Sequence, residues 1–327
     1  MKKMNIILCL LLLAFAVPNT VLAQKVGQSG FKFLDTGVGG RAAGMAEAYT
    51  VLGTGAEAVF YNPAGLVQME KKIDVTFAYN QFIAGINYAA GAAAWNLGRL
   101  GVVGVSFVSP SYPGIEGTVV ADNDQGYIET GKFDVGALAV GLSYAKRLTS
   151  KFTVGGTVKY ASQDLGQSAH EAGGALSDNK ASTLAFDFGT LFYPGFSWLE
   201  SFAFGMSVRN FSQQVKYEIS EFELPLTFSV GFSVDAFDLL GEVKEDMALN
   251  LAVDALHPRD HHERVHLGAE FVYAQMFTVR GGYKFNYDEE GLTFGFGVKK
   301  GPIRVDYAFT EFGVFDNINR FSVGMTF

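Results

Sequence analysis

Histidine and acidic side chains gather in one short stretch, from His257 to His266. Imidazole and carboxylate groups are common ligands of zinc, so a hairpin of this composition could hold a metal ion. However, His261 and His262 are neighbours in sequence and point to opposite faces if the chain is extended. We therefore interpret the stretch as a hydrated outer loop, with His266 pointing into a polar interior beside Arg264, and predict no metal site.

A second pattern with chemical meaning is Gly37-x-Gly39-x-x-Ala42, which superficially resembles a dinucleotide-binding loop. Such a loop needs a preceding strand and a following helix within a βαβ unit. An all-strand pattern follows here, so we interpret the glycines as a site of tight backbone packing. The sequence has no G-x-S-x-G nucleophile elbow, and its one cysteine, Cys9, lies in a leader that we expect to be removed. We predict no catalytic residue, no cofactor and no enzymatic activity.

Ionisable residues recur on one face of the predicted strands. They could line a transport path, or they could form ion pairs and hydrogen bonds that brace a polar interior. Charges that are shielded from lipid inside a barrel are ordinary, so we favour the bracing interpretation. The residues are Lys159, Asp187, Arg209, Asp254, Glu270, Arg280, Lys284, Lys299, Arg304 and Asp306.

Alternating segments position these residues, and they follow one another from Ile73 onward. Each has about ten residues, the length that a tilted strand needs to cross a bilayer. In one of the clearest, Val305 and Tyr307 alternate with Arg304 and Asp306. We predict fourteen strands at 73–82, 85–96, 100–109, 133–147, 152–164, 182–194, 201–212, 224–236, 247–257, 264–275, 277–286, 291–299, 302–310 and 320–327. An even number places both termini of the chain at the periplasm, with most of the longer connections at the outer end.

The last segment has one wholly apolar face, formed by Phe321, Val323, Met325 and Phe327. Side chains alternate along a strand, so this face would meet lipid while the small and polar residues between them face the lumen. The ending is similar to the C-terminal signal that bacterial outer-membrane barrels present to the barrel-assembly machinery, which we therefore expect as a partner.

The beginning of the chain has the pattern of an export signal. A basic start precedes an apolar run at 6–17 and a small-residue site ending at Ala23, so we predict a signal peptide over residues 1–23. No later run is apolar and long enough for a membrane-spanning helix, so a protein of this kind crosses a membrane only as a closed barrel. The net charge of −8 argues against a nucleic-acid partner.

Residues 24–72 differ from the rest because they are rich in Gly and Ala and lack strict alternation. We predict a short helix over Ala42–Tyr49 and a helical turn over Glu57–Leu66 that is stopped by Pro63. The predicted fold is therefore all-β: a 14-stranded antiparallel transmembrane β-barrel over residues 73–327. The N-terminal segment, 24–72, is the candidate for a hatch folded into its lumen.

Two stretches carry a resemblance to a known family. Gly40-Arg-Ala-Ala-Gly-Met45 and Tyr61-Asn-Pro-Ala-Gly-Leu66 resemble the N-terminal signature of the PorV/PorQ family, within the FadL/OmpP1 class of outer-membrane barrels. The closing residues 305–323 are similar to the family's ending. The resemblance implies an N-terminal hatch inside a fourteen-stranded barrel. The positions that match the hatch motif and the signature upstream of it are Gly44, Met45, Asn62, Pro63 and Ala64.

The resemblance also implies a function in the cell outer membrane. PorV-like barrels serve type IX protein secretion by capping the side opening of a large translocon, or by carrying cargo that is recognised by its C-terminal domain. The alternative is a FadL-like passive transporter of hydrophobic small molecules, and a structural or adhesive barrel also stays open. For cargo or translocon contacts we single out two outer loops, through Tyr112 and Pro113 and through Phe312 and Phe315.

Overall fold

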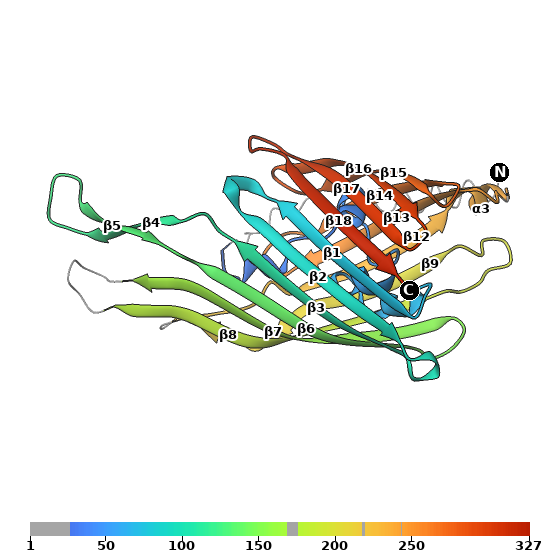
Figure 1. Cartoon of the computed structure of the whole chain (residues 1–327), viewed down its shortest axis with the longest axis horizontal. Helices are drawn as coiled ribbons and strands as arrows, with labels where there is room; N and C mark the ends of the chain where they lie inside the picture. Colours follow the sequence, from blue (N-terminus) through green and yellow to red (C-terminus); the bar gives the residue numbers. More distant parts are fainter. Residues whose placement is uncertain (1–26, 169–175, 218–219, 243) are drawn as a thin grey trace.

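The chain folds into a closed barrel of fourteen antiparallel strands (Figure 1). The structure is a computed structural model and describes residues 27–168, 176–217, 220–242 and 244–327. Around the barrel the strand order is β1-β18-β17-β16-β15-β14-β13-β12-β9-β8-β7-β6-β3-β2. This confirms the predicted fold class. The predicted signal peptide, residues 1–23, lies outside the described residues.

Each predicted segment corresponds to one strand of the wall. The wall strands are β1 (Ile73–Gln81), β2 (Asn87–Asn96), β3 (Val102–Ser111), β6 (Gly136–Arg147), β7 (Phe152–Ser168), β8 (Ser177–Phe192), β9 (Ala203–Ser212), β12 (Thr227–Asp235), β13 (Met247–Pro258), β14 (Arg264–Tyr273), β15 (Phe277–Phe285), β16 (Glu290–Lys300), β17 (Ile303–Phe312) and β18 (Ile318–Thr326). β7 and β8 extend beyond their predicted ends because they continue to pair as far as Ser168 and Ser177. Their sequence loses its apolar face there, so alternation does not reveal the extension.

Two small sheets lie outside the wall. β4 (Ile115–Val120) and β5 (Tyr127–Phe133) form a hairpin within the predicted loop 110–132, and β10 (Val215–Lys216) pairs with β11 (Glu221–Phe222). The β4–β5 hairpin projects past the barrel on the same side as the extended β7 and β8 (Figure 1). The expectation of a plain loop at 110–132 was therefore incomplete. Nearly all of β5 is exposed, so the hairpin has no buried face to impose a clear alternating pattern. We call the end of the barrel with this hairpin the outer end.

The side chains that alternate in sequence point alternately to the outside and to the inside of the barrel wall. Phe321 and Val323 on β18 are 44% and 47% exposed, whereas Arg320 and Ser322 between them are buried. β18 pairs with β1 along its length, and Phe327 and Ile73 exchange two backbone hydrogen bonds, of 2.8 and 3.1 Å. The last strand therefore closes the ring while its apolar face points outward.

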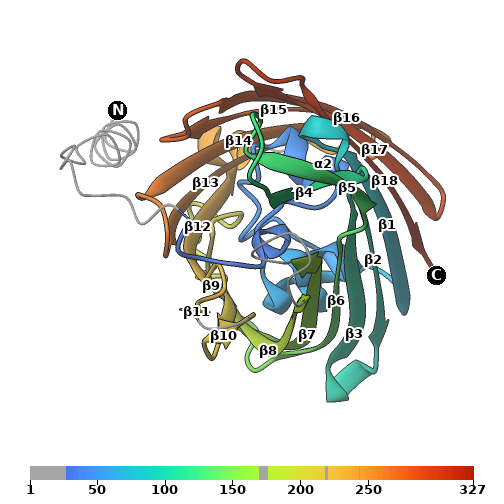
Figure 2. The same cartoon turned by 90° about the vertical axis from the view of Figure 1, so that its left-hand side faces the viewer.

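The N-terminal segment, defined here as residues 31–69, lies in the middle of the ring of strands (Figure 2). It contains η1 (Lys32–Leu34), α2 (Gly40–Gly44), η2 (Gly55–Phe60) and η3 (Pro63–Gln68). The remaining short helices lie in turns between wall strands: η4 (Ile83–Gly85), η5 (Gly98–Leu100) and α3 (Ala236–Leu240). No helix in the described part of the chain is long and apolar enough to cross a membrane.

Two predictions about this segment were wrong in detail. The helix expected over Ala42–Tyr49 ends at Gly44, because Ala46 and Glu47 adopt φ values of 52° and 61°, in the left-handed region where a right-handed helix does not continue. Pro63 does not stop a helix but begins η3. Proline is accommodated at the first helical position because its missing amide hydrogen has no intrahelical acceptor there.

We predict that Val323→Arg destabilises the barrel by about 2–4 kcal/mol, because an arginine near the middle of a lipid-facing strand is moved out of water. Val314→Arg is the matched control, since Val314 lies in an outer loop and is 85% exposed. The free energy of unfolding in lipid vesicles measures both changes. Equal stability of the two variants would contradict the assignment of this face to lipid.

Candidate functional site

The N-terminal segment contacts opposite walls of the barrel. α2 packs against β15, β16, β17 and β18, and η3 packs against β3, β6, β7 and β8. β16 and β7 stand seven places apart in the ring of fourteen strands. The segment therefore crosses the lumen as a brace.

Gly44 and Met45 fit against one wall where the strands carry glycine. A Cβ atom on Gly44 would lie 3.0 Å from the Cα atom of Gly295 on β16. Met45 is fully buried, and a Cβ atom on Gly268 of β14 would lie 2.6 Å from its carbonyl oxygen. The close approach of two backbones thus explains why Gly44 and the wall residues Gly268 and Gly295 lack side chains.

Asn62, Pro63 and Ala64 fit against the other wall in the same way. The Asn62 side chain caps η3 by accepting a hydrogen bond from the Ala64 amide at 3.1 Å, and it donates to the Thr50 carbonyl at 2.8 Å. A Cβ atom on Gly189 of β8 would lie 1.9 Å from Asn62 Oδ1, and one on Gly155 of β7 would lie 2.5 Å from the Ala64 nitrogen. Glycine at these two wall positions is required by the segment.

Carboxylates of the wall bind backbone amides of the segment. Asp254 on β13 accepts hydrogen bonds from the amides of Tyr49 and Thr50, both at 2.8 Å. Asp74 on β1 accepts one from the Ala56 amide at 2.9 Å. Buried amides need such partners because no water reaches them. These contacts support the bracing interpretation for Asp254.

Six charged side chains form a continuous series of ion pairs that begins on the segment, runs along the inner wall and ends on the segment. Its members, in order of contact, are Arg41, Glu270, Arg280, Asp306, Arg304 and Glu57. Arg41 binds both oxygens of Glu270 at 2.9 Å, the bidentate geometry of a strong charge-assisted pair. Arg280 joins Glu270 at 2.8 Å and Asp306 at 2.8 Å, with both acids almost fully buried. Loss of one partner would leave a buried charge uncompensated.

The sequence analysis did not single out Arg41 and Glu57, which are the segment's side of these ion pairs, or Glu47 of the segment, which pairs with Lys284 and Arg320 of the wall. A signal was present: these are charged residues within a Gly- and Ala-rich stretch that is predicted to lie inside a barrel, where charges must be paired. The wall glycines carried a similar signal, since glycine at an inward position of a strand often marks the close approach of another backbone.

Asp260, in the outer loop 259–263, fixes the start of the segment. Its carboxylate accepts hydrogen bonds from Ser29 and from His261, the latter at 2.8 Å, and pairs with Lys32 at 3.0 Å. Burial raises the pKa of Asp260, but the hydrogen bonds and the charge of Lys32 outweigh it and hold this pKa well below its usual range. The ionised carboxylate therefore holds the segment at the outer end.

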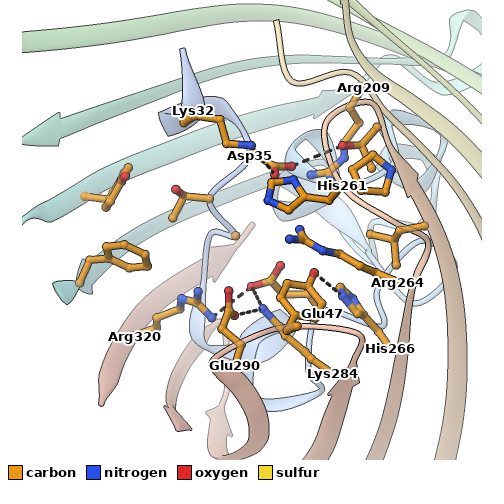
Figure 3. Close-up of a pocket in the computed structure, with 18 residues that line it drawn as sticks. Lys32, Asp35, Glu47, Arg209, His261, Arg264, His266, Lys284, Glu290 and Arg320 are labelled. Carbon is orange, nitrogen blue, oxygen red and sulfur yellow. Dashed lines mark hydrogen bonds and ion pairs between the residues drawn. The ribbon is translucent and has the colours of Figure 1, made fainter. Parts of the chain in front are cut away.

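A cavity of about 270 Å³ lies between this anchor and the wall (Figure 3). Glu47 of the segment pairs there with Lys284 at 3.1 Å and with Arg320 at 3.2 Å. Lys284 also pairs with Glu290. Arg209 and Arg264 line the same space, so charged side chains dominate its surface.

The histidine-rich stretch is divided between loop and lumen. His257 is exposed and pairs with Glu263 at 3.3 Å, while His266 is buried and contacts the Tyr287 hydroxyl at 2.7 Å. His262 to His266 has the H-E-x-x-H spacing, which brings two histidines close enough to share a metal ion in a helix but not in a strand, where they lie roughly 13 Å apart. Here β14 begins at Arg264. Within the described residues, no three His, Cys, Asp or Glu side chains are grouped to hold a metal ion.

The two predicted partner-binding loops meet at the outer rim through the short loop 82–86. The rings of Phe312 and Phe315 lie 5.8 Å apart, and Phe82 lies 5.8 Å from Phe312. Pro113 faces Gly85 from the other side, where a Cβ atom would lie 3.8 Å from the proline ring. We call Phe82, Pro113, Phe312 and Phe315 the rim patch, whereas Tyr112 lies beside Gln163 and Tyr217 and is not part of it.

Comparison with known proteins gives one family match. The family model described as type IX secretion system membrane protein PorP/SprF matches residues 112–325, more than half of the chain. No curated protein matches the sequence. The family is one of type IX secretion, as the sequence analysis expected, while membership of PorV/PorQ in particular stays a prediction.

Several solved structures have a fold similar to that of this chain. The CymD monoaromatic hydrocarbon channel is 14% identical with a TM-score of 0.60, over 89% of this chain and 98% of that chain. The Pseudomonas putida toluene transporter TodX is 13% identical with a TM-score of 0.53, over 92% and 98%. A Pseudomonas aeruginosa FadL homologue is 12% identical with a TM-score of 0.52, over 88% and 97%. At these identities the likeness concerns the barrel fold alone.

We predict that Gly155→Ala destabilises the protein by about 1–3 kcal/mol, because the added methyl group overpacks a filled interior at Ala64. Gly156→Ala is the control. A Cβ atom there meets nothing closer than 3.4 Å, so we expect a change within about 0.5 kcal/mol. Chemical denaturation of the two variants measures the difference. Equal effects would show that the segment does not press on this wall.

We predict that Asp260→Asn speeds amide hydrogen exchange at residues 29–34 by about tenfold at pH 7, because hydrogen bonds to a charged group contribute about 1.5–3 kcal/mol. Because the folded pKa is lowered, this stabilisation is present above the usual pKa of about 3.9 and is lost as the pH falls below it. The exchange rates of the wild type and the variant should therefore become similar in acid. Asp316→Asn, in an exposed outer loop, should leave the exchange unchanged; the same acceleration in that variant would argue against the anchor.

Proposed function

The chain belongs to the PorP/SprF family of type IX secretion system membrane proteins, and on this basis we propose that it is a non-enzymatic component of type IX protein secretion in the outer membrane. The observation that carries the proposal is the family match over residues 112–325. The barrel fold with an apolar outer face is consistent with this location. The proposed partners are outer-membrane lipid, the barrel-assembly machinery, a large translocon and secreted cargo.

The braced lumen supports a role that does not require conduction. The segment is held to opposite walls by glycine contacts, carboxylate–amide hydrogen bonds and buried ion pairs. A passive channel would need this assembly to move. We therefore propose that the segment is a fixed hatch, and that Gly44, Met45, Asn62, Pro63 and Ala64 hold it in place.

The finer proposal is a PorV/PorQ-type role at the outer surface. We propose that the rim patch contacts the translocon or the C-terminal domain of the cargo. Its support is the exposure of Phe315, at 52%, and the convergence of three loops on the same edge. Aromatic side chains that cluster at a surface are frequent anchors of protein interfaces.

A transporter of hydrophobic small molecules is the alternative, because the barrel resembles hydrocarbon channels in fold. Such a protein should have an apolar pocket beside the hatch and a gap in one wall strand. The cavity above the segment has eight charged residues in its lining, and Phe82, Tyr88, Leu256 and Pro258 contribute apolar surface to it. The wall is interrupted locally where Ser109 and Pro110 of β3 do not pair with β6, since proline has no amide hydrogen to donate. The strand registers also shift between β7 and β8, between β8 and β9 and between β16 and β17.

Purification of the native protein in mild detergent, with mass spectrometry of everything that accompanies it, separates the two functions. Recovery of a very large barrel subunit, or of exported proteins that share a C-terminal domain, is expected. Recovery of the barrel alone with bound hydrophobic molecules would contradict the secretion role and favour the transporter.

We predict that the double variant Pro113→Asp, Phe315→Asp reduces the recovery of such partners at least about tenfold, the effect of losing interface anchors worth more than 1.4 kcal/mol. The matched control is Val120→Asp combined with Ile128→Asp on the β4–β5 hairpin, where both residues are exposed. Heat-dependent migration in gels would verify that each barrel is folded. Unchanged recovery by a folded rim variant would exclude the rim patch as the contact.

A further inference from the structure

The cavity above the segment concentrates positive charge. Its lining contains five cationic side chains, Lys32, Arg209, Arg264, Lys284 and Arg320, and three acidic ones, Asp35, Glu47 and Glu290. With neutral histidines the lining has an excess of two positive charges, or of one when Asp260, the partner of Lys32 just outside the lining, is counted. The net charge of the chain is −8. The local charge is thus opposite in sign to that of the whole protein.

The acidic side chains of the lining are already occupied by other cations. Glu47 pairs with Lys284 and Arg320, Glu290 pairs with Lys284, and Asp35 pairs with Lys32 at 3.5 Å. None of these contacts involves Arg209 or Arg264. Over the described part of the chain, these two guanidinium groups are therefore the cations of the lining that have no ion pair.

Among the described residues, neither Arg209 nor Arg264 forms an ion pair, although Arg209 shares a smaller pocket with Glu47 and Asp254. Arg209 donates a hydrogen bond to the Phe60 carbonyl at 3.1 Å and lies over the Tyr61 ring at 5.8 Å. Arg264 lies over the Tyr287 ring at 4.0 Å, and its Nε atom is buried without a hydrogen-bond partner. Figure 3 shows the Arg264 guanidinium pointing into the middle of the cavity. Partly desolvated guanidinium groups favour an anion beside them.

The size and access of the cavity limit what this anion can be. A volume of about 270 Å³ corresponds to roughly nine water molecules at about 30 Å³ each, which is enough for a small ligand but not for a long hydrocarbon chain. The Lys32 side chain at its edge is 45% exposed, so the cavity is accessible from the outer end. Nearby buried polar atoms also lack partners, namely His266 Nδ1 and Arg320 Nε.

We propose that this cavity is a binding site for a small hydrophilic oxyanion, a phosphate or carboxylate group, held by Arg264 and Arg209. The planar fork of a guanidinium matches both groups with two parallel hydrogen bonds. The bound anion would neutralise the excess charge between the hatch and the wall. The proposal does not depend on a role in secretion, because it rests on the charges of the cavity alone.

The test uses the full barrel in detergent at low ionic strength, with inorganic phosphate and sodium acetate as probes, sodium chloride as the ionic-strength control and octanoate as the apolar competitor. Isothermal calorimetry gives the affinity, and the unfolding temperature rises with a ligand that binds only the folded state. The variants are Arg264→Gln and Arg209→Gln. Lys132→Gln is the matched control, because it removes the same charge from a side chain that is 68% exposed on the hairpin.

We expect saturable binding of phosphate or acetate to the wild type and to Lys132→Gln, weakened at least about tenfold in Arg264→Gln and in Arg209→Gln, the scale of one lost charge-assisted hydrogen bond. Preference for phosphate over acetate, or the reverse, identifies the anionic group. Arg264→Lys keeps the charge without the fork and should bind with intermediate affinity, which covers the case in which a glutamine variant does not fold. A response that chloride reproduces at equal ionic strength, equal binding by the arginine variants, or binding of octanoate alone would overturn the proposal.

Discussion

A polypeptide backbone that runs through the interior of a barrel must have its buried amide and carbonyl groups satisfied by the barrel, and this constraint organises the molecule. Each wall region that meets the segment supplies a partner: Asp254 for two successive amides, Asp74 for another, and Ser322 for the Gly40 amide at 3.1 Å. An unsatisfied buried amide is destabilising. The inner face of the wall is therefore shaped as much by the segment as by the barrel itself.

The same constraint explains why the inner wall has glycine at some positions and charged residues at others. Where the backbone of the segment touches a strand, the wall residue is glycine, as at Gly155, Gly189 and Gly295. Where the segment presents a charged side chain, the wall supplies the opposite charge, as Glu270 does for Arg41. Buried ion pairs add little net stability but define one arrangement strongly, because displacement leaves charges unpaired. The segment is thus fixed in register as well as in place.

The cavity at the outer end departs from this balance of charges. The segment and the wall neutralise one another through most of the lumen, but Arg209 and Arg264 face the cavity without an acidic partner. Most other charged side chains of the interior form ion pairs. Two guanidinium groups without such a partner therefore indicate that a ligand supplies the opposite charge. The outer surface of the wall has the opposite character, with apolar side chains that suit lipid or a partner protein.

The sequence by itself determined the barrel. Alternation with period two encodes which face of each strand meets lipid, and it placed all fourteen wall strands within a few residues. It did not reveal the β4–β5 hairpin, which has little buried surface, or the true ends of the short helices, which depend on left-handed residues such as Ala46. The pairing of Arg41 with Glu270 and the excess charge of the cavity also required the structure. Arg41 and Glu270 are separated by 229 positions along the chain, and only closure of the ring around the segment brings such residues together.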